Sequence, residues 1–314
     1  TVGSSGPRRG HDTIVGVARS GTMGSMSPVP EVRVAQRALG EVLRSKVAGS
    51  DAGERGLQIW GKPGERWFVP TDPIWRVHED AAMFPGGVAA LLLQSLHPLA
   101  MAGVAGHSGY KGDPWGRLHR TSNYIAVVTY GTIPDAEALI AQVRGVHERV
   151  RGKDERGRPY RASDPHLLTW IHVAEIAAFL WTHRAYGPRP LSDADADTYV
   201  AQTGVSARLL GVPEPPTSVA GLEEVIASFL PELELTNAAA ETIDFLLRTP
   251  PLPWAARPGY WMLAAGGIAV LPDWARDLIG TRVPVPVGRA LGRVGAATVR
   301  WGLAGVESGR RSAP

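Results

Sequence analysis

Apolar residues recur at helical spacing along most of the chain, and capping residues divide them into segments. Asp72-Pro73, Asp113-Pro114 and Asp164-Pro165 each place an N-cap carboxylate before a proline at the first helical position, so we predict three helix starts there. Further helix starts are predicted at four capping residues, Ser192, Ser218, Thr236 and Asp273. The last helix is predicted to span about residues 286–302.

Strand patterns are scarce by comparison. Only short apolar pieces such as residues 58–60 and 67–69 are compatible with strands, so we predict at most a minor hairpin near residues 61–64. The pattern therefore predicts an all-α fold.

Two apolar stretches are candidates for membrane spans. Gln94, His97 and Pro98 interrupt the centre of residues 86–106, and residues 259–271 are too few to cross a bilayer. Both stretches are predicted to be buried helices, so no stable membrane span is expected.

The helical patterns continue on both sides of the proline clusters at residues 213–216 and 249–253, and no internal repeat is present. We therefore predict a single domain over residues 29–314. Residues 1–28 are rich in Gly, Ser and Arg, and we predict that they form a flexible N-terminal extension.

Charge and cysteine content remove several classes of protein. The chain has 314 residues, of which 33 are Lys or Arg and 30 are Asp or Glu, so it lacks the one-sided basic excess of a general nucleic-acid binder. With no cysteine, it has no disulfide, thiolate zinc site, iron–sulfur cluster or covalently attached haem. No apolar run of signal-peptide length follows Arg8-Arg9, so a cytoplasmic location is expected.

The helix predicted over residues 113–131 carries a polar stripe. Arg117, Arg120, Thr121 and Tyr124 share one helical face because they lie at positions i, i+3, i+4 and i+7. Such a stripe either faces water or lines a pocket, and the pattern alone leaves both interpretations open.

A second helix, predicted over residues 134–152, places Arg144, His147 and Arg151 on one face. Neutral imidazole binds iron, and guanidinium groups pair well with the propionates of haem. The alternative is a surface histidine among helix-supporting charges, and periodicity does not decide between them.

Two further histidines lie in apolar surroundings. His172 belongs to an aromatic-rich segment, residues 162–187, and His97 precedes a proline in an apolar stretch. Each is either a core histidine bonded to a carbonyl or a residue that binds or supports a ligand. Zinc-hydrolase, serine-hydrolase and nucleotide-loop motifs are incomplete in this sequence.

Taken together, these segments resemble the bacterial branch of the rubber oxygenase family, which includes latex clearing protein and the mycophenolic acid (MpaB-like) oxygenase. The resemblance is carried by four motifs in order: LLLQSLHPLAMAGVAGHS, RLHRT, RGVHERVR and YRASDPHLLTWIH. It covers residues 73–211 well and the rest by general helical character.

The resemblance implies a globin-like helical domain that encloses a pocket for non-covalent haem b. It implies that His147 is the proximal iron ligand, with Arg144 and Arg151 around it and His172 as a further cofactor-binding residue. It implies that Arg117, Arg120 and Thr121 line the distal side as catalytic residues. The expected partners are a small hydrophobic substrate and dioxygen or peroxide; a homo-oligomer is among the options for its assembly.

Two departures from the family pattern refine this expectation. Arg120 stands where latex clearing protein has lysine, and because arginine stays charged it should not ligate iron. Rubber-cleaving members have a glutamate on the preceding helix, but residues 91–105 contain no acid, so cleavage of polyisoprene is not expected. The alternatives to a haem oxygenase are a haem carrier or sensor without turnover and a metal-free helical protein that binds apolar ligands.

Overall fold

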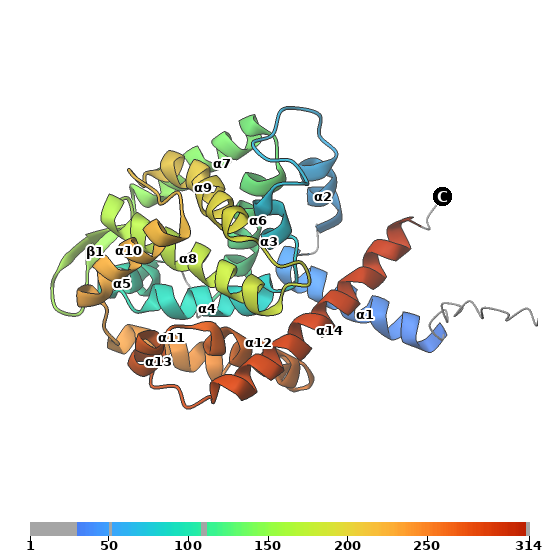
Figure 1. The fold of residues 1–314 in the computed structure, drawn as a ribbon. Helices are drawn as coiled ribbons and strands as arrows, with labels where there is room; N and C mark the ends of the chain where they lie inside the picture. Colours follow the sequence, from blue (N-terminus) through green and yellow to red (C-terminus); the bar gives the residue numbers. More distant parts are fainter. Residues whose placement is uncertain (1–29, 50–51, 108–111, 312–314) are drawn as a thin grey trace, which may run out of the picture.

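The computed structural model describes residues 30–49, 52–107 and 112–311, and within these ranges the chain is almost entirely helical (Figure 1). The α-helices are α1 (Pro30–Ala48), α2 (Ala52–Trp60), α3 (Pro73–His78), α4 (Met83–Ser95), α5 (Pro98–His107), α6 (Pro114–Tyr130), α7 (Ile133–His147), α8 (Pro165–Tyr186), α9 (Asp193–Leu210), α10 (Val219–Phe229), α11 (Asn237–Leu247), α12 (Arg257–Val270), α13 (Asp273–Ile279) and α14 (Val285–Arg311). Two 3-10 helices, η1 (Leu230–Glu232) and η2 (Trp254–Ala256), complete the helical part. The all-α prediction is confirmed, and the predicted extension over residues 1–28 lies outside the described residues.

The predicted helix starts are confirmed, mostly with the capping bonds that the sequence suggests. The side chains of five residues accept a backbone N–H in the first turn of their helices: Asp113, Asp164, Ser192, Ser218 and Thr236. Asp72 differs, because its carboxylate accepts the N–H of Val69 at 2.7 Å and so closes the loop before α3.

The hairpin predicted near residues 61–64 is wrong. Residues 58–60 end helix α2 and residues 61–64 have no regular structure, with the Arg66 guanidinium donating to the carbonyls of Ile59 and Lys62. The only sheet in the described part of the chain pairs β1 (Arg151–Lys153) with β2 (Pro159–Arg161), antiparallel.

The core is built around α4 and α8, which lie side by side in the middle of the molecule (Figure 1). Leu92 and Leu93 of α4 and Trp170 and Leu180 of α8 are almost fully buried. Helices α9 and α10 pack on α8, and α12 packs on both central helices. Because α8 is apolar on nearly all sides, any ionisable side chain that it carries inward must be explained by its partners or by its function.

The two apolar stretches form α4, α5 and α12, and α4 and α12 are largely buried. Among the described residues, no single helix is long and apolar enough to cross a membrane. Helices α4 and α5 together reach that length and composition, but the chain bends by 108° between them. The bend places the residue that joins them, His97, in the interior.

Candidate functional site

The four residues of the predicted polar stripe on α6 differ in their exposure to solvent. Arg117 and Tyr124 are partly buried, whereas Arg120 and Thr121 are exposed. The side chain of Arg120 lies 3.5 Å from the Asp113 carboxylate at the start of the helix and is 65% exposed. The hydroxyl of Thr121 donates to the carbonyl of Arg117 on its own helix. The inward members of the stripe are therefore Arg117 and Tyr124.

Helix α7 ends at His147, so the prediction of a helix to residue 152 is wrong. The carbonyl of Val150 accepts the N–H of Ala162 from the far side of the hairpin, and the chain continues as strand β1. Arg151 consequently lies on an exposed strand and does not share a helical face with Arg144 and His147. Its role toward a cofactor stays a prediction.

His147 combines partial burial with an unsatisfied ring nitrogen. Its Nδ1 is buried and has no hydrogen-bond partner. Burial lowers the pKa of His147 from its ordinary value, against an opposing effect of Glu148, so the ring is neutral near neutral pH. Arg144, one turn earlier, is exposed and donates to the carbonyl of Leu209 at 3.3 Å, which ties the end of α9 to α7.

His172 on α8 shows the same combination in a more enclosed place. Its Nε2 is buried and has no hydrogen-bond partner, and burial lowers the pKa of His172 to about 4. The prediction that this ring lies inside is confirmed. A neutral imidazole with a buried free nitrogen is the form in which histidine binds metals.

The sequence reasoning missed Glu175, one turn after His172. Its carboxyl is hydrogen-bonded to Gln94 of α4, and burial raises the pKa of Glu175 to about 7. The charge of Glu175 in turn adds to burial in raising the pKa values of Tyr124 and Tyr199. The only signal in the sequence was a single acid in an otherwise apolar helix.

Gln94 is the residue that links the two central helices at this point. Its amide donates to the carbonyl of Ile171 at 3.2 Å, and its backbone carbonyl accepts the indole N–H of Trp170 at 3.3 Å. Glu175 bonds to this residue and acts on Tyr124 through its charge, and all three are half-buried side chains, from α4, α8 and α6. We call Gln94, Tyr124, His172 and Glu175 the interior polar group.

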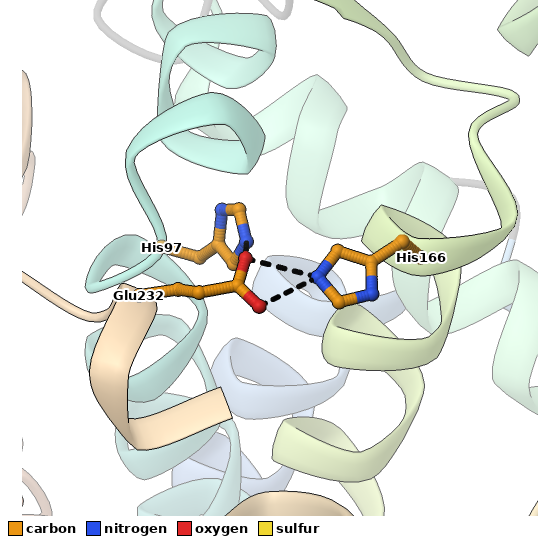
Figure 2. A group of neighbouring side chains, drawn as sticks. All are labelled: His97, His166 and Glu232. Carbon is orange, nitrogen blue, oxygen red and sulfur yellow. Dashed lines mark hydrogen bonds and ion pairs between the residues drawn. The ribbon is translucent and has the colours of Figure 1, made fainter. Parts of the chain in front are cut away.

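A second group of ionisable side chains lies at the start of α8. His97, His166 and Glu232 point toward one another from the α4–α5 bend, α8 and η1 (Figure 2). Burial lowers the pKa of His97, with Glu232 opposing the change. Burial alone would raise the pKa of Glu232, but the hydrogen bond from His166 and the neighbouring histidine charges hold it below its ordinary value.

Comparison with known proteins points to one family. The family described as ER-bound oxygenase mpaB/B'/Rubber oxygenase, catalytic domain, matches residues 75–301 of this chain. Uncharacterized proteins of Mycobacterium bovis and Mycobacterium tuberculosis are each 31% identical over 148 residues, which are 46% of this chain and 57% of the relative. The match thus spans little more than half the length of these curated relatives. No solved structure matches significantly.

Proposed function

This chain belongs to the family of mpaB and rubber oxygenase catalytic domains, and from this premise we propose that it is a haem b-dependent oxygenase that acts on a small hydrophobic compound. The matched region includes every residue of the interior polar group, and His147 with its unsatisfied Nδ1. When bound, haem b would supply the redox chemistry with dioxygen or peroxide.

The observation that carries the proposal is the unsatisfied Nδ1 of His147 on α7 and the unsatisfied Nε2 of His172 on α8; on α8, both ring nitrogens of His183 are unsatisfied as well. A buried polar atom without a partner costs about 1–3 kcal/mol, so the fold tolerates the free nitrogens of His147 and His172 at a cost that a ligand would recover. Neutral imidazole nitrogens fit an iron porphyrin, and the pairing of Arg144 and Arg151 with its propionates stays a prediction, since the two lie on different elements. We assign the iron to His147, with His172 as the alternative ligand.

Glu175 is the residue that we propose for holding a proton at this site. A carboxyl whose pKa is about 7 exchanges a proton readily at neutral pH. The sequence argument against polyisoprene used the missing acid in residues 91–105, yet Gln94 in that stretch is bonded to Glu175 of α8. Glu175 is thus a further candidate for the proton-transfer group, and the expectation that polyisoprene is not cleaved stays a prediction.

The proposed substrate class follows from what surrounds these polar residues. Leu92 and Val173 are fully buried beside Gln94 and His172, and Ile125 and Ile171 pack against the same core. The side chains around Gln94 and His172 are therefore mostly apolar, which suits an apolar substrate. Arg120 and Thr121 are exposed, and their catalytic roles stay predictions.

The decisive experiment is an absorption spectrum of protein produced with sufficient haem, read beside two variants. We expect a Soret band with one haem per chain. His147→Ala should lose stoichiometric haem, or at least the signature of imidazole ligation, because no cysteine can replace the ligand. His172→Ala is the matched control, and it should retain the band.

Each other outcome selects another interpretation. A band that persists in His147→Ala and disappears in His172→Ala would move the ligand to α8. Haem binding without substrate-dependent oxygen consumption would indicate a carrier or sensor. The absence of a Soret band, with no uptake on titration, would contradict the proposal and favour a metal-free binding protein for apolar ligands.

A further inference from the structure

We propose that His97, His166 and Glu232 form a binding site for a divalent transition-metal ion, separate from the proposed haem site (Figure 2). One ring nitrogen of each histidine and a carboxylate oxygen of Glu232 all lie within 4.8 Å of one another. Both oxygens of Glu232 lie 2.9 Å from Nε2 of His166, and Oε2 lies 3.3 Å from Nε2 of His97. These three atoms converge on one point from three different elements.

His97 provides the observation that points to a ligand. The residue is 2% exposed, and its Nε2 faces Glu232 without making a hydrogen bond of good geometry. Its Nδ1 lies 3.5 Å from the backbone N–H of Ala100, as a weak acceptor at the start of α5. In the neutral ring that accepts this contact the proton lies on Nε2, so an ion at Nε2 would displace that proton and give up the weak contact with Ala100.

The chain holds all three ligands in place before any ion binds. Each is next to a proline, in the pairs His97-Pro98, Pro165-His166 and Pro231-Glu232, and proline fixes its own φ angle. Phe229 packs on both rings, with centroids 4.5 Å from His166 and 6.0 Å from His97. Preorganised ligands lose little conformational entropy when they bind a metal.

The backbone supports the same geometry. The N–H of Glu234 donates to the carbonyl of Leu96 at 2.9 Å, which fastens η1 to the α4–α5 bend. The ring of Trp170 lies 6.3 Å from that of His97 and closes the inner side. An ion at this point would join η1, α8 and the bend into one unit.

The donor set selects the class of metal. Two imidazole nitrogens and a carboxylate suit Zn²⁺ in sites with three protein ligands, and the same set binds Fe²⁺ with further positions open. Mg²⁺ and Ca²⁺ prefer oxygen ligands throughout. The side chains of His166 and Glu232 are 53% and 43% exposed, so water can complete the coordination from the outer side.

The site is distinct from the one proposed for haem. His166 and His172 are six residues apart on α8, which is about 9 Å along the axis and a rotation of about 240° between their side chains. They therefore leave the helix on different faces. The two proposals can fail independently.

Zn²⁺ binding to the full chain tests the proposal directly. Protein without an affinity tag is treated with a chelator and titrated with Zn²⁺ alone by calorimetry, and the absorption of bound Co²⁺ reports the coordination. We expect one ion per chain. His166→Ala and Glu232→Gln, both at exposed positions, should weaken binding by at least roughly 100-fold, since even changes outside the ligand set cost 10- to 100-fold in affinity.

Glu234→Gln is the matched control, because this nearby carboxylate pairs with Arg156 and Arg158 rather than with the histidines. It should bind Zn²⁺ like the parent. Circular dichroism and haem content, measured on every variant, separate lost binding from lost folding or lost haem. No binding by the parent, or equal binding by His166→Ala and Glu232→Gln, would overturn the proposal and leave a hydrogen-bonded cluster.

Discussion

At the level of single residues, the most informative group is the carboxyl of Glu175. An ionised carboxylate in an apolar core is costly, and the fold keeps this one protonated up to about pH 7 instead of pairing it with a cation. Its hydrogen bond to Gln94 satisfies part of the group without neutralising it. Such an arrangement destabilises the folded chain at neutral pH, which is typical of a residue retained for function.

Glu175 should make stability fall as the pH rises from about 4.5 to about 7. Within this window the unfolded chain has released the proton that the folded chain still holds, so higher pH favours unfolding. In Glu175→Gln this contribution is absent. We expect the variant to gain stability relative to the parent across the window, by up to about 3 kcal/mol above pH 7.

Urea unfolding at a series of pH values, at matched haem content, measures this difference. The buried histidines, including His78 with its pKa lowered to about 3, impose an opposite slope at acid pH, but both chains share it. Glu224→Gln, at an exposed position on α10, should follow the parent. Parallel curves for the parent and Glu175→Gln would show that this carboxyl is not perturbed.

The candidate site was predictable only where its residues are close in sequence. The inward position of His172 followed from the apolar residues around it, and the polar stripe on α6 followed from helical spacing. The importance of Glu175 depends on Gln94 of another helix. The cluster of His97, His166 and Glu232 depends on contacts between three elements that no local pattern encodes.

At the level of elements, the close approach of α12 and α14 depends on glycine. A Cβ at Gly266 would lie 2.5 Å from the Cα of Gly292, a contact with backbone that cannot move aside locally. The hydroxyl of Tyr186 donates to the Gly266 carbonyl at 2.8 Å and fixes α8 to the same crossing. The small residues thus set the distance between two helices that cover the core.

Gly266→Ala should destabilise the fold by about 1–3 kcal/mol, because the added methyl group forces the helices apart. Gly259→Ala on the same helix is the control, since a Cβ there meets nothing within 4 Å and alanine favours helix. Thermal unfolding of both variants gives the comparison. Equal stability of the two would mean that the crossing adjusts freely.

Helix starts were predicted well and one helix end was not, for a physical reason. Asp113, Asp164 and Ser192 act through bonds within one turn, so sequence alone identifies them. The apolar spacing around Val146 and Val150 continues past the end of α7, yet the chain leaves the helix to pair with β2. Pairing across a hairpin is not local, so Arg151 was placed on the wrong kind of element.

At the level of the whole molecule, α14 closes the fold by crossing α1 and α12 (Figure 1). Its main polar anchor is Arg300, which donates to both carboxylate oxygens of Asp80 at 2.8 and 3.0 Å and to the carbonyl of Tyr186 at 3.2 Å. The side chain of Asp80 is 9% exposed and that of Arg300 is 34% exposed. One pair therefore joins the α3–α4 connection, the end of α8 and the last helix.

Removing Asp80 or Arg300 from this pair should lower the free energy of unfolding by more than the loss of an exposed surface ion pair does. Asp80→Asn leaves a guanidinium partly buried beside a neutral amide, and we expect a loss of about 1–3 kcal/mol in the free energy of unfolding. Asp244→Asn, in an exposed pair with Arg248 on α11, should cost less than about 0.5 kcal/mol. A double-mutant cycle of Asp80→Asn and Arg300→Met, followed by denaturant unfolding, isolates the coupling between the two side chains.

Because the pair links segments 220 residues apart, its loss should loosen α14 as a whole and increase amide hydrogen exchange along the helix. Unchanged exchange in α14 with the same loss of stability would show that helix packing, rather than this pair, holds the C-terminal helix to the core.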